Sequence, residues 1–230
     1  MIVKKIKIFD VVFTNEIEGF EIEAFRGAIA QLVGFEHALF HNHNTDNTVS
    51  YAYPLVQYKV KGKKASLTFI DQGVDEAKAF FRNKNCEITL SGRTFKLELD
   101  TFQLRNAFFS IGTERYEYTV SQWMPLNQDN YKSFKQLKTT DEKVAMLEKI
   151  LTGNILSLAK SLNWIIESVV KVEILEITDE KLVNFKKNKV ATYDFVFKSN
   201  VQLPQNIGLG KGVSRGFGVI QTKQKLNPVF

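Results

Sequence analysis

Residues 51–70 have the sequence YAYPLVQYKVKGKKASLTFI, and this stretch decides the fold. Two runs rich in aromatic and β-branched residues, 51–60 and 65–70, flank the sequence Lys61-Gly-Lys63. A short glycine-containing turn between two such runs is typical of a β-hairpin. The stretch therefore predicts two adjacent antiparallel strands.

A strand and a helix precede this hairpin, and a helix and a strand follow it. Residues 2–13, rich in Ile, Val and Phe, predict a strand, while residues 74–82 predict a short helix and residues 86–90 a strand. Before the hairpin, an apolar stripe at helical spacing predicts a helix that ends at Gly34 and leaves Glu23 and Arg26 outside. The stripe consists of Ile22, Phe25, Ile29, Leu32 and Val33. The order β-α-β-β-α-β predicts a ferredoxin-like sheet covered by two helices on one face.

The second half of the chain repeats this order incompletely. Strands are predicted at 95–104, 107–111 and 115–123, and further strands at 169–177, 189–201 and 217–222. Between these two groups a helical region is predicted at about 130–166. Within this region a helix restarts at a capping box formed by Thr139 and Glu142. A glycine-rich segment stands where the second helix belongs. We therefore predict an α+β protein of two tandem ferredoxin-like (RRM-like, βαββαβ) halves packed together, the second lacking a regular second helix. The expected domains are 1–105 and 106–230.

Composition bounds the class of protein. The 230 residues are 44% hydrophobic, which is enough for packed cores. Because the chain contains no run of about 18 apolar residues and no export signal, we expect no membrane association and a cytoplasmic location. The single cysteine, Cys86, excludes an internal disulfide and favours a packing role.

Positive charge is concentrated near the C-terminus. Residues 181–230 hold nine Lys or Arg and one acid, Asp194, which gives this segment a net charge of +8 within a chain total of +6. A local basic surface is typical of nucleic-acid binding, although a solvated basic tail is the alternative.

Five glycines fall within residues 208–218, GLGKGVSRGFG. Glycine permits positive φ and close approach of the backbone, so successive N–H groups can surround an anion, and Lys211 and Arg215 add charge. The alternative is a structural device that lets the last strand pack tightly.

All three histidines, His37, His41 and His43, lie on the segment after the first predicted helix. Histidine exchanges protons near neutral pH, and functional groups are often found on loops. A zinc fragment and ordinary packing are alternatives; the spacing fits no known zinc pattern, and a structural role is favoured for His37. In the following strand, alternation places Tyr51, Tyr53, Leu55, Gln57 and Lys59 on one face. That face suits base stacking and phosphate binding, or is simply half-exposed.

With these motifs, the chain resembles the CRISPR-associated RAMP endoribonucleases, which process precursor CRISPR RNA at its repeats. The resemblance rests on Gly210-Lys-Gly-Val-Ser-Arg-Gly-Phe-Gly218, on the repeated ferredoxin-like order, and on His41-Asn-His43 followed by Tyr53-Pro-Leu-Val-Gln-Tyr-Lys59. It implies metal-independent cleavage, without a cofactor, by attack of the ribose 2′-OH, which gives a 2′,3′-cyclic phosphate and a 5′-OH. Under this hypothesis His43 is the principal acid or base, His41 the second, Tyr51 assists proton transfer, and Lys59 stabilises the phosphorane.

The resemblance also implies CRISPR repeat RNA as the partner. The candidate RNA-binding residues are Gly208, Gly210, Lys211, Gly212, Ser214, Arg215, Gly216, Lys186, Lys187 and Lys189. Homodimerisation and association with other CRISPR effector subunits are left open. The alternatives are a non-catalytic RNA-binding subunit and a nucleotide-binding enzyme; the latter is disfavoured because the glycines precede a strand and match no P-loop.

Overall fold

The computed structural model describes residues 3–41, 53–83, 85–185 and 188–223. The chain forms two compact units. The N-terminal unit consists of Lys5–Ala107 together with Val213–Gly216, and the C-terminal unit consists of Met1–Lys4, Phe108–Gly212 and Phe217–Phe230. A short piece of the glycine-rich segment thus packs within the N-terminal unit.

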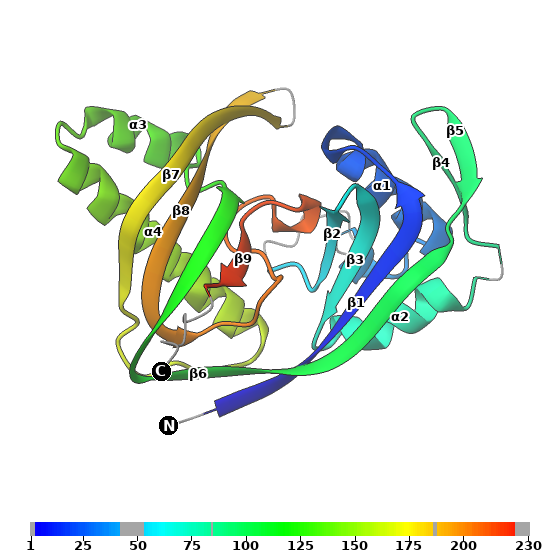
Figure 1. The fold of residues 1–230 in the computed structure, drawn as a ribbon, viewed down its shortest axis with the longest axis horizontal. Coiled ribbons are helices and arrows are strands. Elements are labelled where there is room, and N and C mark those ends of the chain that lie inside the picture. The colour runs from blue at the N-terminus through cyan, green and yellow to red at the C-terminus, as the bar shows by residue number, and fades with distance from the viewer. Residues whose placement is uncertain (1–2, 42–52, 84, 186–187, 224–230) are drawn as a thin grey trace, which may run out of the picture. The chain divides into compact units, whose positions relative to one another are not determined.

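The N-terminal unit contains β1 (Val3–Glu16), α1 (Ile22–Val33), β2 (Val56–Lys61), β3 (Lys64–Ile70), α2 (Gly73–Phe81) and the first part of β6 (Leu99–Trp123). The sheet order is β2-β3-β1-β6, and β1, β2 and β3 pair antiparallel (Figure 1). The predicted hairpin is confirmed, since Lys61 pairs with Lys64 across the turn. This order confirms the ferredoxin-like expectation.

The core of this unit lies between α1, α2 and one face of the sheet. From α1, the stripe residues Phe25, Ile29 and Val33 are buried. From the sheet, the core receives Val11, Phe13, Tyr58, Leu67 and Phe69. The apolar face of the helices and the apolar face of the sheet therefore pack against each other. This burial is why the sequence folds with helices covering one face of a sheet.

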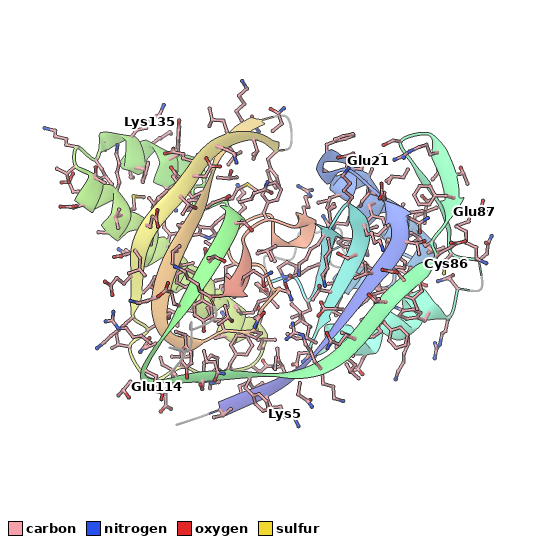
Figure 2. All side chains as sticks on the ribbon, viewed as in Figure 1. Lys5, Glu21, Cys86, Glu87, Glu114 and Lys135 are labelled. Atoms are coloured by element: carbon pink, nitrogen blue, oxygen red, sulfur yellow. The ribbon has the colours of Figure 1, made fainter. Side chains whose placement is uncertain are left out.

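One predicted strand was placed wrongly in the sheet. Residues 86–90 were expected to supply the fourth strand, but β4 (Glu87–Leu90) pairs with β5 (Arg93–Lys96) in a separate hairpin. The fourth strand is β6 instead. Arg93 links this hairpin to the N-terminal end of α1 through a 2.5 Å ion pair with buried Glu21. Cys86, just before β4, is half-buried and its thiol donates to the Asn83 carbonyl (Figure 2).

The C-terminal unit contains the rest of β6, α3 (Gln128–Gln136), α4 (Thr140–Ser161), β7 (Val172–Phe185), β8 (Asn188–Gln202) and β9 (Val219–Thr222). Strand β8 lies between β6 and β7, and β9 pairs with β6. Residues 203–218, all of them described, contain the 3-10 turn η3 (Val213–Arg215) and no α-helix. The missing second helix of the second half is therefore confirmed.

Strand β6 joins into one element what we predicted as three strands. Its register shifts between Ile111 and Tyr116 and again between Val120 and Trp123. We predicted a break between residues 111 and 115, but β6 is continuous there and has β1, β8 and β9 as its neighbours in the sheet. Strand β6 also runs through residues 105 and 106. The domain boundary that we predicted between these two residues stays a prediction.

Helix α4 begins at the predicted capping box. Thr139 Oγ1 accepts a hydrogen bond from the Glu142 N–H at 3.2 Å, and Glu142 Oε2 accepts one from the Thr139 N–H at 3.0 Å. The helix then continues through Gly153, and its buried stripe packs under the sheet residues. Among the helices that the structure describes, none is long and apolar enough to cross a membrane.

Candidate functional site

Side-chain hydrogen bonds hold the backbone of the histidine segment at Phe40 and His41. The Tyr58 hydroxyl, buried on β2, donates to the Phe40 carbonyl at 2.9 Å. Next to it, Arg26 Nη2 on α1 donates to the His41 carbonyl. Two successive carbonyls are thus held by side chains from the sheet and from α1, so the backbone at His41 has a defined position.

The His41 imidazole is oriented by a second hydrogen bond. Its Nε2 lies 2.8 Å from the Phe35 carbonyl oxygen, and the two rings pack with centroids 5.8 Å apart. Because a carbonyl oxygen only accepts, Nε2 must carry the proton in the neutral ring, which leaves the lone pair on Nδ1. This tautomer suits His41 for accepting a proton through Nδ1.

His37 has a different role from His41. Its Nδ1 is 2.8 Å from Glu76 Oε2, and both side chains are about one-third exposed at 32%. The pair ties the segment after α1 to α2. Two other predicted catalytic residues, His43 and Tyr51, lie outside the described residues, as do the predicted RNA-binding residues Lys186 and Lys187.

The predicted RNA-facing side of β2 is buried. The Tyr53 hydroxyl accepts a 2.7 Å hydrogen bond from Gln57, and Gln57 is 0% and Lys59 9% exposed. Lys59 Nζ donates to Thr68 Oγ1 at 3.1 Å, and Thr68 donates to Asp10 at 2.8 Å. Neither sequence interpretation, a stacking surface or a half-exposed strand, anticipated this burial. It arises because these polar groups satisfy one another across neighbouring strands.

Lys59 and His41 are not brought together. Neighbouring residues of a strand point to opposite faces, and Tyr58 points to the helix-covered face where it meets Phe40. Lys59 therefore points to the other face of the sheet, where Asp10 also accepts from Arg105 at 3.4 Å. We call Lys59, Thr68, Asp10 and Arg105 the polar row.

Lys59 should make folding pH-dependent. Burial lowers the pKa of its ammonium to about 7; Asp10 opposes that shift, and Arg105 and Lys61 add to it. The unfolded chain keeps this proton up to the ordinary pKa of 10.5, whereas the folded protein releases it near 7. Stability should therefore rise with pH across this interval, because the unfolded state binds more protons there.

The measurement compares melting temperatures of the wild-type protein and Lys59→Met at pH values from about 6 to 10. Lys59→Met should have its largest stabilising effect at the acidic end, and this advantage should shrink as pH rises. Parallel pH profiles of the two proteins would contradict a lowered Lys59 pKa.

The glycine-rich segment is shaped by close packing. Gly210, Gly212 and Gly218 all have positive φ. A Cβ on Gly210 would lie 2.6 Å from Trp123 Nε1, and one on Gly212 would lie 2.5 Å from Met124 Cε. Gly210 therefore needs glycine for packing against Trp123, whereas Met124 Cε is the end of a flexible side chain, so that Gly212 is favoured mainly by its positive φ.

The remaining predicted RNA-binding residues differ in exposure. Lys211 and Lys189 are exposed, Ser214 is half-buried, and Gly208 is buried and bridges Val219. Gly216, at φ +82°, lies close to β2, since its Cβ would be 3.3 Å from the Tyr58 carbonyl oxygen. This approach brings Arg215 to the N-terminal end of α1, where its Nη2 is 2.7 Å from Glu23 Oε1.

The sequence pattern did not indicate Arg26 as a site residue, because it placed Arg26 outside the apolar stripe of the predicted helix. The structure shows a half-buried side chain that contacts the His41 carbonyl. A signal was available, because position 26 is adjacent to Phe25 and lies three and four residues from Ile29 and Ile22 on the apolar stripe. A cation at the margin of a buried stripe is a candidate functional residue.

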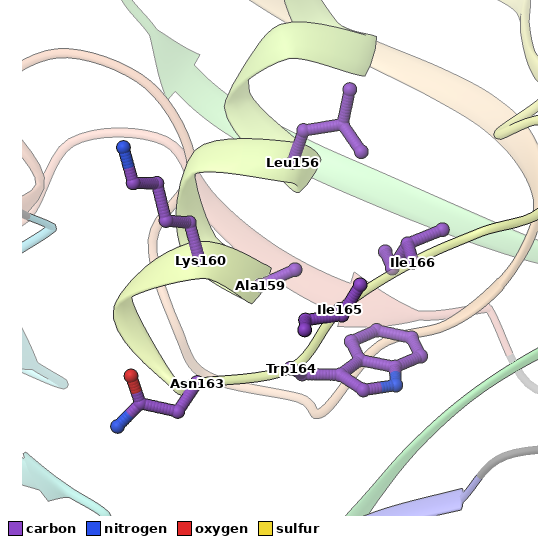
Figure 3. Close-up of a pocket in the computed structure, with 7 residues that line it drawn as sticks. All are labelled: Leu156, Ala159, Lys160, Asn163, Trp164, Ile165 and Ile166. Carbon is purple, nitrogen blue, oxygen red and sulfur yellow. The ribbon is translucent and has the colours of Figure 1, made fainter.

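A pocket in the C-terminal unit contains none of the predicted site residues. It has a volume of about 400 Å³ and lies at the end of α4. In Figure 3, Leu156, Ile166 and Trp164 lie to one side of the helix end, and Lys160 and Asn163 to the other. Its lining is largely apolar and offers no acid–base pair for chemistry.

Two family models together match most of the chain. The Cas6b N-terminal domain matches residues 4–107, and the Cas6b C-terminal domain matches residues 110–223. The chain belongs to the Cas6b family. This membership confirms the resemblance to CRISPR-associated RAMP endoribonucleases that the glycine-rich and histidine segments suggested.

Solved structures agree with Cas6b membership. A crystal structure of Cas6b is 25% identical with a TM-score of 0.81, and covers 96% of this chain and 100% of its own. A second, described as the CRISPR RNA processing endoribonuclease Cas6b, is 24% identical with a TM-score of 0.71 and the same coverage, and supports the fold. An uncharacterized protein of Methanocaldococcus jannaschii is 34% identical over 135 residues, which are 58% of this chain and 90% of that protein.

Proposed function

We propose that this Cas6b-family protein is an endoribonuclease that processes CRISPR RNA, and that it cuts precursor RNA within the repeats without a metal ion. The 2′-OH attacks the adjacent phosphate, and the products end in a 2′,3′-cyclic phosphate and a 5′-OH. The observation that supports this proposal most directly is the placement of His41, whose backbone and Nε2 are both fixed and whose Nδ1 holds the lone pair.

The reaction needs two proton transfers. One group removes the 2′-OH proton, and another protonates the departing 5′-oxygen. We assign these two tasks to His41 and His43, which are two residues apart, with Tyr51 assisting proton transfer. In this mechanism the two histidines supply acid–base catalysis, and a base held beside the 2′-OH also favours its correct placement for attack.

Lys59 receives no step in this mechanism. Its ammonium donates to Thr68 on the face of the sheet opposite the His41 segment. The predicted role of Lys59 in stabilising the phosphorane thus stays a prediction. We propose that exposed Lys211 and Lys189 bind the repeat RNA backbone, because Lys side chains that solvent can reach neutralise phosphates and release their counterions.

The test is incubation of the purified protein with labelled repeat RNA in excess EDTA. We expect one discrete cut, with a 2′,3′-cyclic phosphate on the upstream product and a 5′-OH on the downstream product. The same sequence made as DNA should stay intact, because it has no 2′-OH.

Tight RNA binding without cleavage would instead identify a non-catalytic RNA-binding subunit. Cleavage that appears only after Mg²⁺ is added back, or products with a 5′-phosphate, would overturn the metal-independent mechanism.

A further inference from the structure

Two arginines from distant parts of the chain come together at the first turns of α1, where Arg215 pairs with Glu23 and Arg26 contacts the His41 carbonyl. Arg26 lies on α1, and Arg215 lies at the end of η3, within the same compact unit. Gly216 makes this meeting possible, because a Cβ there would be only 3.3 Å from Ile22 Cδ1 and from the Tyr58 carbonyl oxygen. The chain therefore carries Arg215 to α1 through a position that favours glycine.

Two positively charged side chains at this meeting point are partly buried. Arg26 is half-buried and the Arg215 side chain is 11% exposed, whereas Glu23, which pairs with Arg215, is 60% exposed. Burial is the main cause that lowers the pKa of Arg26; Tyr58 and Glu23 oppose this shift, and the nearby Arg215 adds to it. Two cations are thus partly removed from water close to each other, and an anion bound beside them lowers the energy of this arrangement.

Arg26 has an unused donor at this point. Its Nη2 donates to the His41 carbonyl, but its Nε is buried without a hydrogen-bond partner among the residues that the structure describes. A buried N–H without an acceptor is unfavourable, because its lost hydrogen bond to water is not replaced. A phosphate oxygen accepts well from guanidinium groups, and often accepts two bonds at once.

We propose that Arg26 and Arg215 together hold one phosphate of the RNA, and that Glu23 takes the place of that phosphate when RNA is absent. The carboxylate of Glu23 presents two acceptor oxygens to a guanidinium as a phosphate does, and its exposure lets it move aside. The phosphate belongs to RNA because this inference rests on the proposed function. It makes Arg26 a positioning residue, since the same guanidinium holds the His41 backbone.

The experiment measures the equilibrium affinity for repeat RNA between about 50 and 200 mM salt, using RNA with a 2′-deoxyribose at the mapped cut, or ordinary RNA if the protein does not cut. The variants are Arg26→Gln, Arg215→Gln, the double variant and Glu23→Gln. Arg82→Gln is the matched control, because Arg82 is exposed at the end of α2 and its loss changes the net charge equally.

Each single arginine variant should weaken binding about tenfold at low salt. Each should also reduce the slope of log affinity against log salt by about 0.7, the effect of losing one phosphate contact on a single strand. Because both arginines hold the same phosphate, the double variant should lose less than the two singles combined. Glu23→Gln should strengthen binding severalfold, and Arg82→Gln should leave the slope unchanged.

Several results would overturn the proposal. These are an unchanged slope in a folded Arg26→Gln protein, additive losses in the double variant, or weaker RNA binding by Glu23→Gln. Arg26→Lys serves if Arg26→Gln fails to fold: it should keep the slope but slow cleavage, because a compact ammonium cannot hold the phosphate and the His41 carbonyl together. A loss of RNA affinity by Arg26→Lys as large as its loss of cleavage rate would contradict the positioning role.

The outcome separates this inference from the proposed function. Protein that binds RNA with the expected slopes but does not cut it would refute the nuclease and leave the phosphate site standing. Protein that cuts RNA with unchanged slopes would refute the site alone. Equal protection from heat by inorganic phosphate and by RNA, lost in Arg26→Gln, would assign the site to small anions and overturn the RNA assignment.

Discussion

Cleavage of repeat RNA by the double variant His41→Ala, His43→Ala is expected to be about 10²- to 10⁴-fold slower than cleavage by the wild-type protein. The two changes remove both proposed proton-transfer groups. They leave intact the backbone anchors at Phe40 and His41, because Tyr58 and Arg26 bond to main-chain carbonyls. RNA affinity should therefore change much less than the rate.

The measurement is a single-turnover rate with protein in excess, together with the affinity of each protein for uncleavable RNA. His37→Gln is the matched control: it changes a histidine of the same segment, and its amide can still bond to Glu76. We expect His37→Gln to cut at close to the wild-type rate. A wild-type rate in the double variant would remove these histidines from the chemistry.

Gly218→Ala should be the most destabilising single substitution that we predict. Gly218 has φ +66°, which costs an L-residue about 1 kcal/mol or more, and a Cβ there would clash with the Leu209 carbonyl oxygen. That oxygen cannot easily move, because Gly218 and Leu209 are joined by a 2.8 Å backbone hydrogen bond. We expect a loss of about 3 kcal/mol of unfolding free energy and a melting temperature lower by roughly 6–12 °C.

Comparison with Gly62→Ala separates the destabilisation that the clash causes from the destabilisation that the backbone conformation causes. Gly62 has φ +54°, yet a Cβ there would meet nothing within 4 Å. It should therefore cost about 1 kcal/mol, from conformation alone. Thermal unfolding of both variants makes the comparison. Similar losses in the two would show that the chain relaxes around Gly218 and that the packing there is loose.

The fold was predictable wherever the local sequence pattern of a strand also determines which strand it pairs with. The turn at Lys61-Gly-Lys63 joins its own two strands, so the hairpin was predicted correctly. Residues 86–90 also have a strand pattern, but local alternation does not say which strand they pair with, and they joined β5 rather than the sheet. The order of the large sheet depends on contacts between segments far apart in sequence.

The position of the histidines relative to the first helix was predictable, but the burial and charge of the groups around the candidate site were not. His37 and His41 follow α1 as the order of the sequence requires. The burial of Lys59 depends on Thr68 and Asp10, and the pKa of Arg26 is lowered first by burial and further by Arg215 near the other end of the chain. Such partners are chosen by the tertiary fold, and no local spacing records them.

The continuity of β6 has a consequence for how this family can vary. The two Cas6b domain models meet between residues 107 and 110, inside β6, where the extended chain passes from one compact unit to the other. A recombination point there would join two halves of one strand, whose alternation and register must match neighbours on both sides. A chimera of two relatives joined at this point would therefore have to preserve the side-chain alternation and the pairing register of β6 on both sides of the junction.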